Sequence, residues 1–202
     1  MDLAEIQNNR FCFPDAEAAK AAEDYLDQKI AECDSVGGVV ECVISGLPAG
    51  LGEPVFEKLD ANLAKVILSI GAVKGFEIGD GFAATKACGS ENNDEFRMDG
   101  DKIVKETNHA GGVLGGISDG SDVVFRAAFK PTPSIAKSQE TVTKDGANID
   151  LVIHGRHDPV VVPRAVVVVE SMAAITAMDM LLMSMASRLD LIQMFFQVEN
   201  AD

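Results

Sequence analysis

The stretch at 108–120, NHAGGVLGGISDG, decides how the middle of this chain folds. Five glycines lie within residues 111–120, and glycine lets the backbone adopt positive φ and approach another group closely. The apolar run Val123–Phe129 predicts a strand, which delivers the turn Lys130-Pro131-Thr132-Pro133-Ser134. Exposed N–H groups in a glycine loop, with a lysine and two hydroxyls beyond the strand, suit a phosphate or another anion. A plain tight turn is the alternative, and the residues alone leave it open.

Composition bounds the class of protein. The 202 residues are enough for a single domain over residues 1–202 with a substantial core. With 17 basic against 32 acidic residues and no tryptophan, the chain lacks the basic surface and aromatic platforms that nucleic acid requires. We therefore expect no nucleic-acid partner. Four scattered cysteines without a CxxC pair predict a reducing, cytoplasmic location and no metal site, and the polar residues 1–10 show no signal peptide.

The most apolar segment, 165–185, is long enough to raise the question of a membrane. Glu170 and Asp179 interrupt it, and each carboxylate would be costly at a bilayer centre. We expect instead a buried core helix over about 163–189 and no membrane partner. A short strand at 166–169 is the local alternative, because four consecutive valines are a poor helix signal.

The remaining pattern mixes helices and strands. Amphipathic spacing predicts helices at 16–33, capped by Asp15, and at 55–70. Strands are predicted at 39–45, 73–78, 82–88 and 149–153, the middle two joined at the Gly79-Asp80-Gly81 turn. The polar segment 89–105 predicts a mobile excursion or an inert surface loop. Without a regular βαβ rhythm, this order predicts an α+β fold in which antiparallel strands cover helices.

A second group of polar residues, HGRHDP at 154–159, follows the last predicted strand. Arg156 could clamp a phosphate or carboxylate with two donors. Asp158 or His157 could move a proton if its surroundings shift its pKa. The alternative is a salt-bridged strand end in which all three residues are structural, and the residue types leave both interpretations open.

Six segments, in this order and spacing, resemble the chorismate synthase family. They are DSVGG at 34–38, GLPAGLGEPVF at 46–56, AVKGFEIGDGF at 72–82, AGGVLGGIS at 110–118, KPTPSI at 130–135 and GRHDP at 155–159. The resemblance extends from about Cys12 to about Leu189. It implies the family's α+β fold, a β-α-β sandwich with antiparallel sheets packed on long central helices, here in part.

The resemblance also implies an activity. The family is a carbon–oxygen lyase of the shikimate pathway, which leads to the aromatic amino acids. It converts 5-enolpyruvylshikimate 3-phosphate to chorismate and phosphate by a 1,4-anti elimination, and it needs reduced FMN (FMNH2) although no net redox change occurs. The family assembles as a homotetramer, so the resemblance implies a small-molecule substrate and a homo-oligomer.

Roles carry over by position. The resemblance implies that Lys130, Pro131, Thr132, Pro133 and Ser134 bind FMN, that Gly115 lies against the flavin, and that Gly71 and Ala72 contact it through the main chain. Arg156 matches an arginine that faces flavin and substrate. Asp158 matches a carboxylate that assists proton removal, whereas His157 between them is expected to be structural. We expect the glycine loop, the Lys130 turn and the Arg156/Asp158 strand end to converge on one ligand.

One departure concerns the family's N-terminal motifs. Its Ser-His-Gly, Gly-His-Ala-Asp and Ser-Ala-Arg motifs do not occur here, where the histidines are His109, His154 and His157. We therefore expect the C-terminal part of a chorismate synthase. The alternative to an active lyase is a truncated, catalytically inactive fragment that binds FMN or forms oligomers.

Overall fold

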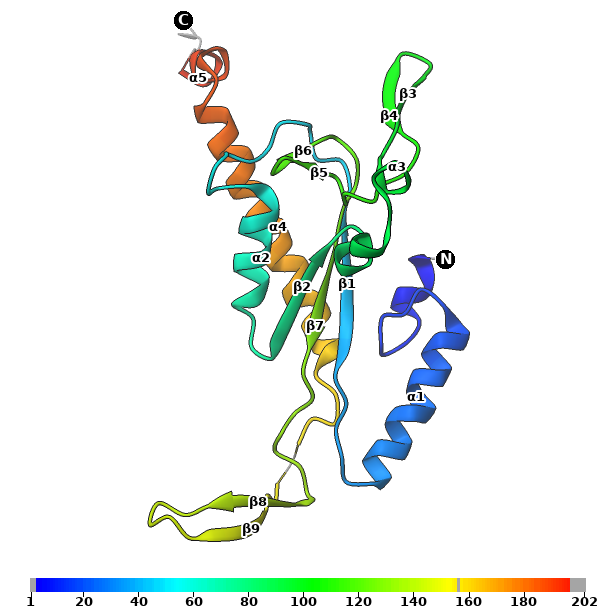
Figure 1. The fold of residues 1–202 in the computed structure, drawn as a ribbon, viewed down its shortest axis with the longest axis vertical. Helices are drawn as coiled ribbons and strands as arrows, with labels where there is room; N and C mark the ends of the chain where they lie inside the picture. Colours follow the sequence, from blue (N-terminus) through cyan, green and yellow to red (C-terminus); the bar gives the residue numbers. More distant parts are fainter. Residues whose placement is uncertain (1–2, 156, 197–202) are drawn as a thin grey trace, which may run out of the picture. The chain divides into compact units, whose positions relative to one another are not determined.

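The structure is a computed structural model that describes residues 3–155 and 157–196 (Figure 1). In chain order its elements are η1 (Leu3–Gln7), α1 (Ala16–Ala31), β1 (Gly38–Ile44), α2 (Leu59–Leu68), β2 (Val73–Ile78), η2 (Gly81–Lys86), α3 (Gly89–Asn92), β3 (Phe96–Asp99), β4 (Lys102–Lys105), β5 (Val113–Leu114), β6 (Ile117–Ser118), β7 (Val123–Phe129), β8 (Ser138–Val142), β9 (Asn148–Val152), α4 (Val162–Ala186) and α5 (Leu189–Phe196). Helices and antiparallel hairpins together make an α+β fold, as the sequence predicts.

The chain divides into two compact units, which we describe separately. The first unit comprises Met1–Val40, Ala72–Lys74 and Ala128–Val168, and the second comprises Glu41–Gly71, Gly75–Ala127 and Val169–Asp202. One three-stranded sheet has the order β1-β7-β2, and β3–β4, β5–β6 and β8–β9 form two-stranded sheets. A single domain over residues 1–202 stays a prediction.

The core of the second unit lies between sheet and helices. In β7 every second side chain from Val123 onward is buried, because successive side chains of a strand point to opposite faces. Phe125 is fully buried and its ring stacks on Phe76 with 5.4 Å between centroids. Helix α2 contributes its apolar stripe to the same core, namely Leu59, Leu63 and Ile67. The sequence predicted that this helix begins at residue 55, but it begins at Leu59.

Helix α4 buries one face only. Val169, Ala173, Ala177 and Met180 are buried, and the amide of Asn62 on α2 contacts the Met180 sulfur at 3.9 Å. The opposite face exposes large apolar side chains such as Ile175, Met178 and Leu182. The prediction of a buried core helix is therefore confirmed for one face of α4. The other face is not covered by any described part of the chain. No strand interrupts it at 166–169.

By length and composition α4 is apolar enough to cross a membrane, with a mean hydropathy of 1.9 over its most apolar window. Glu170 and Asp179 lie within this helix. The absence of a membrane partner stays a prediction.

One local prediction is wrong. Residues 81–86 form the 3-10 helix η2, not the strand expected at 82–88. Gly79 and Gly81 both have positive φ, and the Glu77 carboxylate accepts the Phe82 N–H at 3.2 Å, so the chain coils instead of extending. The Phe82 side chain is 77% exposed, so no apolar contact favours a strand.

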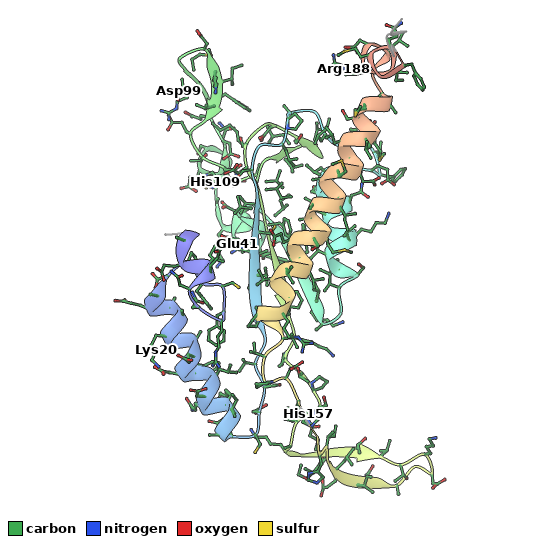
Figure 2. The ribbon with its side chains drawn as sticks, turned by 180° about the vertical axis from the view of Figure 1, so that it is seen from behind. Lys20, Glu41, Asp99, His109, His157 and Arg188 are labelled. Carbon is green, nitrogen blue, oxygen red and sulfur yellow. The ribbon has the colours of Figure 1, made fainter. Side chains whose placement is uncertain are left out.

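The segment 89–105 is also more regular than the sequence indicated. It forms α3 and the β3–β4 hairpin, in which Met98 pairs with Ile103. Figure 2 shows Asp99 at the far end of this hairpin, with His109 closer to the sheet. The hairpin is exposed, whereas Asp94 and Lys105 within the segment are buried. Whether the segment is mobile or an inert part of the surface stays a prediction.

Helix α1 in the first unit matches its prediction closely. It begins after Asp15, whose carboxylate accepts the Ala18 N–H at 2.8 Å. An aspartate at this position satisfies an N–H group that would otherwise lack a partner in the helix.

Candidate functional site

The predicted site residues fall in both units. Ala72, Lys130–Ser134 and Asp158 belong to the first unit, and Gly71 and Gly115 belong to the second. Arg156 lies outside the described residues. The convergence of the glycine loop, the Lys130 turn and the Arg156/Asp158 strand end on one ligand stays a prediction.

In the first unit, a short stretch after α1 joins two of the predicted segments. The Ser35 hydroxyl donates to the Thr132 carbonyl at 2.6 Å. The next N–H, that of Val36, donates to the Pro159 carbonyl at 2.8 Å. The Lys130 turn and the segment beside Asp158 are thus both held by adjacent residues of the same stretch.

Two further main-chain contacts fix the Lys130 turn. Gly37 lies so close to the Phe129 carbonyl and to Pro131 that a Cβ at this position would collide with both. The Lys130 N–H donates to the Ala72 carbonyl at 2.9 Å. Ala72 itself has a φ of 71°, a left-handed conformation that non-glycine residues adopt rarely. The structure therefore places Ala72 beside Lys130. Their role in binding FMN stays a prediction.

The charged groups of this region are exposed. The Lys130 ammonium and the hydroxyls of Thr132 and Ser134 have no hydrogen-bond or ionic partner within the described part of the chain. The Asp158 carboxylate pairs with Arg164 at 2.8 Å, and the Arg164 side chain is 75% exposed. The sequence analysis missed Arg164, because the first turn of an apolar helix gave no sign that its arginine would reach the preceding loop.

In the second unit, the glycine stretch forms the β5–β6 hairpin with Gly115 and Gly116 at its tip. Their φ angles are 61° and 89°, which a residue with a side chain adopts only with strain. A Cβ at Gly116 would collide with the Lys58 side chain, whereas a Cβ at Gly115 would meet nothing within 4 Å. The tip is therefore closely packed at Gly116 and open at Gly115.

Ser118 anchors the base of this hairpin. Its hydroxyl accepts the Leu51 N–H at 2.9 Å and donates to the Pro48 carbonyl at 2.7 Å. The Gly116 carbonyl accepts the Leu59 N–H at 2.9 Å, which satisfies the first N–H of α2. The hairpin is thus held against the loop at 46–54 and against the start of a helix.

Beside the hairpin lies a buried ionic cluster that the sequence did not reveal. The Lys105 ammonium is 2.7 Å from Asp119 and 3.2 Å from Asp94, and all three side chains are less than a tenth exposed. Lys105 also donates to the Asn108 side-chain carbonyl at 3.2 Å. These residues lie in a stretch of the sequence rich in charge, where a solvated surface was the natural expectation.

Hydrogen bonds keep the two carboxylates ionised. Burial by itself would raise the pKa of Asp94, but the Ala110 N–H, the Thr107 hydroxyl and the His109 N–H all donate to it, so its pKa lies well below the usual value. Burial opposes ionisation of Asp119 in the same way. Its bond to Lys105 and the Ser121 N–H nevertheless lower its pKa.

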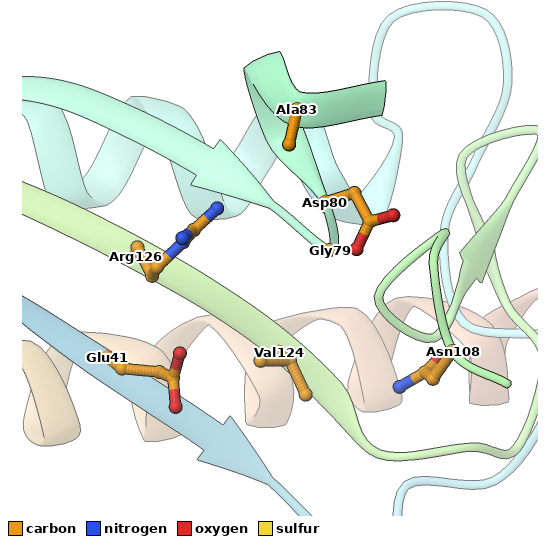
Figure 3. A pocket seen from close by; sticks show the side chains of 7 residues that line it. All are labelled: Glu41, Gly79, Asp80, Ala83, Asn108, Val124 and Arg126. Atoms are coloured by element: carbon orange, nitrogen blue, oxygen red, sulfur yellow. The ribbon is translucent and has the colours of Figure 1, made fainter. Parts of the chain in front are cut away.

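A shallow pocket of about 330 Å³ opens on the sheet in the second unit (Figure 3). Glu41, Val124 and Arg126 line it from the strands, and Gly79, Asp80, Ala83 and Asn108 line it from the turn and the loop. Arg126 is occupied by Glu77 at 2.8 Å, and Asp80 by the His109 ring at 2.7 Å. Arg126 and Asp80 therefore already have ionic partners on the protein.

The Lys130 turn is a better fit to a phosphorylated cofactor such as FMN. An exposed ammonium and two hydroxyls without other partners are donors of the kind that phosphate oxygens accept. No group of three or more His, Cys, Asp or Glu side chains within the described residues could hold a metal ion.

These features define an α+β protein with a glycine hairpin and an exposed lysine turn suited to anions. A sequence model of the chorismate synthase family matches residues 2–182. The chain belongs to the chorismate synthase family.

Individual relatives agree. Chorismate synthase of Lachnoclostridium phytofermentans is 63% identical over 187 residues, which are 92% of this chain and 51% of the relative. That of Agathobacter rectalis is 62% identical over 97% of this chain and 53% of its own length. A crystal structure of chorismate synthase superposes with a TM-score of 0.75 at 31% identity, covering 90% of this chain and 48% of the other. This chain spans about half the length of the relatives it matches.

Proposed function

We propose that this chain supplies one half of a chorismate synthase, which eliminates phosphate from 5-enolpyruvylshikimate 3-phosphate to give chorismate and requires reduced FMN. Family membership over residues 2–182 is the observation that carries the proposal. The exposed donors of the Lys130 turn support it locally, because cofactor and substrate both carry phosphate.

Within this proposal the chain's own residues have separate tasks. Lys130, with the Thr132 and Ser134 hydroxyls, binds FMN, and Ala72 and Gly71 contact it through the main chain. When bound, reduced FMN supplies the electron-rich ring that the elimination depends on. Gly115 provides an open backbone surface for that ring.

The catalytic residues are Asp158 and Arg156. Arg156 pairs with an anionic group of the substrate, since guanidinium binds phosphate and carboxylate with two parallel hydrogen bonds. Asp158 assists removal of the substrate proton. Its exposed partner Arg164 can release the carboxylate at little cost, because exposed ion pairs contribute at most about 1 kcal/mol.

The alternative is an inactive fragment that binds FMN or forms oligomers. The chain spans about half the length of its relatives, and this alternative concerns the activity of that part by itself. Anaerobic addition of reduced FMN and 5-enolpyruvylshikimate 3-phosphate to the purified chain separates the two. Release of chorismate and phosphate supports the lyase, whereas FMN binding without turnover supports the fragment.

The role of Asp158 is tested in a polypeptide that joins this chain to the half of the Lachnoclostridium phytofermentans relative that it does not span. We expect Asp158→Asn to lower kcat at least a hundredfold, in the range typical of general acid–base groups, with little change in the Kd for FMN. Arg164→Gln is the matched control and should change kcat less than threefold. Equal losses of turnover and of FMN affinity in Asp158→Asn would contradict a role in proton removal.

We also infer a cytoplasmic homo-oligomer, in line with a tetramer. The four cysteines are free, as a reducing compartment favours. The exposed apolar face of α4 is a surface that an assembly would cover. Light scattering of Ile175→Glu tests this: we expect a lower mass than for the unaltered chain. Ile103→Glu, at an exposed isoleucine of β4, should not change the mass.

A further inference from the structure

The β5–β6 hairpin cannot hold its shape by itself. Each of its strands has two residues, and an isolated two-stranded hairpin is marginal in water even when longer. Gly111, Gly112, Gly115 and Gly116 all have positive φ. Glycine loses more conformational freedom on folding than any other residue, so this loop needs contacts from outside to remain in one conformation.

Ser118 and Gly116 supply some of those contacts. The buried ionic cluster supplies others, at both ends of the loop. On the near end, Asp94 accepts the N–H groups of His109 at 2.7 Å and Ala110 at 3.0 Å. On the far end lies Asp119, whose N–H donates to the Gly112 carbonyl at 3.0 Å. Lys105 pairs with both carboxylates. The two ends of the loop are thereby held next to each other.

Asn108 extends the same cluster into the loop. Its side-chain carbonyl accepts from Lys105 at 3.2 Å and from the Gly112 N–H at 2.8 Å. Its amide donates to the Asp122 carbonyl at 2.8 Å. The side-chain carbonyl therefore joins Lys105 to the loop at Gly112. The side-chain amide holds Asn108 to the main chain at Asp122.

Stability is a poor explanation for such an arrangement. Three charges with less than a tenth of each side chain exposed have lost most of their hydration, and well-packed apolar residues would usually serve stability as well or better. What directional ionic contacts add is a single geometry. In this chain the geometry they define is that of the hairpin whose tip is open at Gly115.

We propose that Asp94, Lys105 and Asp119 are positioning residues that fix the conformation of the Gly111–Ser118 hairpin and so the place of Gly115. The role of Gly115 as a flavin contact rests on the proposed function. The conformational role of the cluster does not, and the two are tested separately.

Hydrogen exchange of the purified chain tests the conformational role. In Asp94→Asn, which keeps the shape of the side chain but removes an acceptor, we expect amides at 111–118 to exchange at least tenfold faster. Amides of α2 and of β7 up to Ala127, in the same unit, should accelerate much less than those at 111–118. Arg97→Met is the matched control: it removes the exposed Arg97–Glu106 ion pair, 2.7 Å long, from the neighbouring hairpin, and should leave 111–118 unchanged.

Asp119→Asn is the second variant, because it leaves the Lys105–Asp94 pair in place and removes the Lys105–Asp119 ion pair at the other end. The main-chain bond from Asp119 to the Gly112 carbonyl is not affected by the substitution. It should give the same local acceleration. Unchanged exchange at 111–118 in both variants would overturn the proposal. Equal acceleration throughout the unit would overturn it too, because the cluster would then be an ordinary contributor to stability.

Flavin titration tests the link to the site. With FMN fluorescence as the signal, we expect Asp94→Asn to raise the Kd at least threefold and to alter the visible spectrum of the bound flavin, while Arg97→Met does neither. Faster exchange at 111–118 with an unchanged Kd and spectrum would overturn the link between the hairpin and the flavin. If the unaltered chain does not bind FMN, the proposed cofactor fails, and the exchange rates still decide the role of the cluster.

Discussion

The two regions that carry the predicted site residues are built in opposite ways. Around the β5–β6 hairpin, the charges of Asp94, Lys105 and Asp119 are buried and paired. Around the Lys130 turn, main-chain hydrogen bonds do the holding, and the Lys130 and Asp158 side chains are left at the surface. The first region buries its charges in one fixed geometry, whereas the second leaves its charges largely exposed. The difference predicts that substitutions in the first region cost more stability than those in the second.

The largest effect is expected from Lys105→Met. The substitution leaves two buried carboxylates without their cation, and breaking a buried ion pair in this way typically costs about 3–5 kcal/mol. Urea unfolding followed by circular dichroism measures the loss. Arg97→Met, which breaks an exposed pair, should change the free energy of unfolding by less than about 0.5 kcal/mol. Similar losses in both variants would remove the contrast between buried and exposed charges.

The second largest effect is expected from acid, which should destabilise the hairpin region. The pKa values of Asp94 and Asp119 are lowered in the folded chain, so the unfolded chain binds protons more readily. Their contribution to stability is complete above their unfolded pKa of about 4 and is lost as the pH falls through the folded values. We expect the free energy of unfolding to fall below pH 4, and to fall less steeply in Asp94→Asn. Equal slopes in the two proteins would show that Asp94 does not contribute.

A smaller loss is expected from Ser118→Ala. The hydroxyl accepts the buried Leu51 N–H, and an unsatisfied buried donor costs about 1–3 kcal/mol. In the other region, Ser35→Ala removes only a donor to the Thr132 carbonyl at a half-buried position, and about 0.5–1.5 kcal/mol is expected. Thermal unfolding of both variants under one condition ranks them. A larger loss for Ser35→Ala would reverse the comparison.

The smallest effect is expected from Arg164→Gln. Its ion pair with Asp158 is largely exposed, and such pairs contribute between about 0 and 1 kcal/mol. The free energy of unfolding should stay within about 0.5 kcal/mol of that of the unaltered chain. A loss above about 2 kcal/mol would show that this strand end is built like the hairpin region.

Periodic elements could be predicted from the sequence. The cap at Asp15 and the alternation in Val123–Phe129 depend on near neighbours in the chain, and each is found where expected. The apolar stripe predicted for the helix at 55–70 is found from Leu59 onward, whereas Phe56 is 86% exposed. The strand expected at 82–88 was wrong, because Gly79, Gly81 and the Glu77 carboxylate coil this stretch. A pattern of apolar residues does not report a side chain that binds the backbone five residues away.

The candidate site was only partly predictable for the same reason. Motifs located Ala72 and the Lys130 turn, and the structure brings these two together through one main-chain hydrogen bond. Nothing in the sequence distinguished Lys105 and Asp94 from the solvated charges around them. Asp94 and Asp119, the two partners of Lys105, are 11 and 14 residues away from it in the sequence. Local patterns do not extend over such distances.

By itself, the sequence determined the family, the main helices and strands, and the residues with chemistry suited to a phosphate, because local propensity and ordered motifs encode these. Only the tertiary structure decided which charges are buried and what surrounds each glycine. Burial depends on segments that meet in space, and the same lysine is a solvated charge or a buried one according to what packs over it. For this reason the Lys105 cluster appears only when the chain is folded.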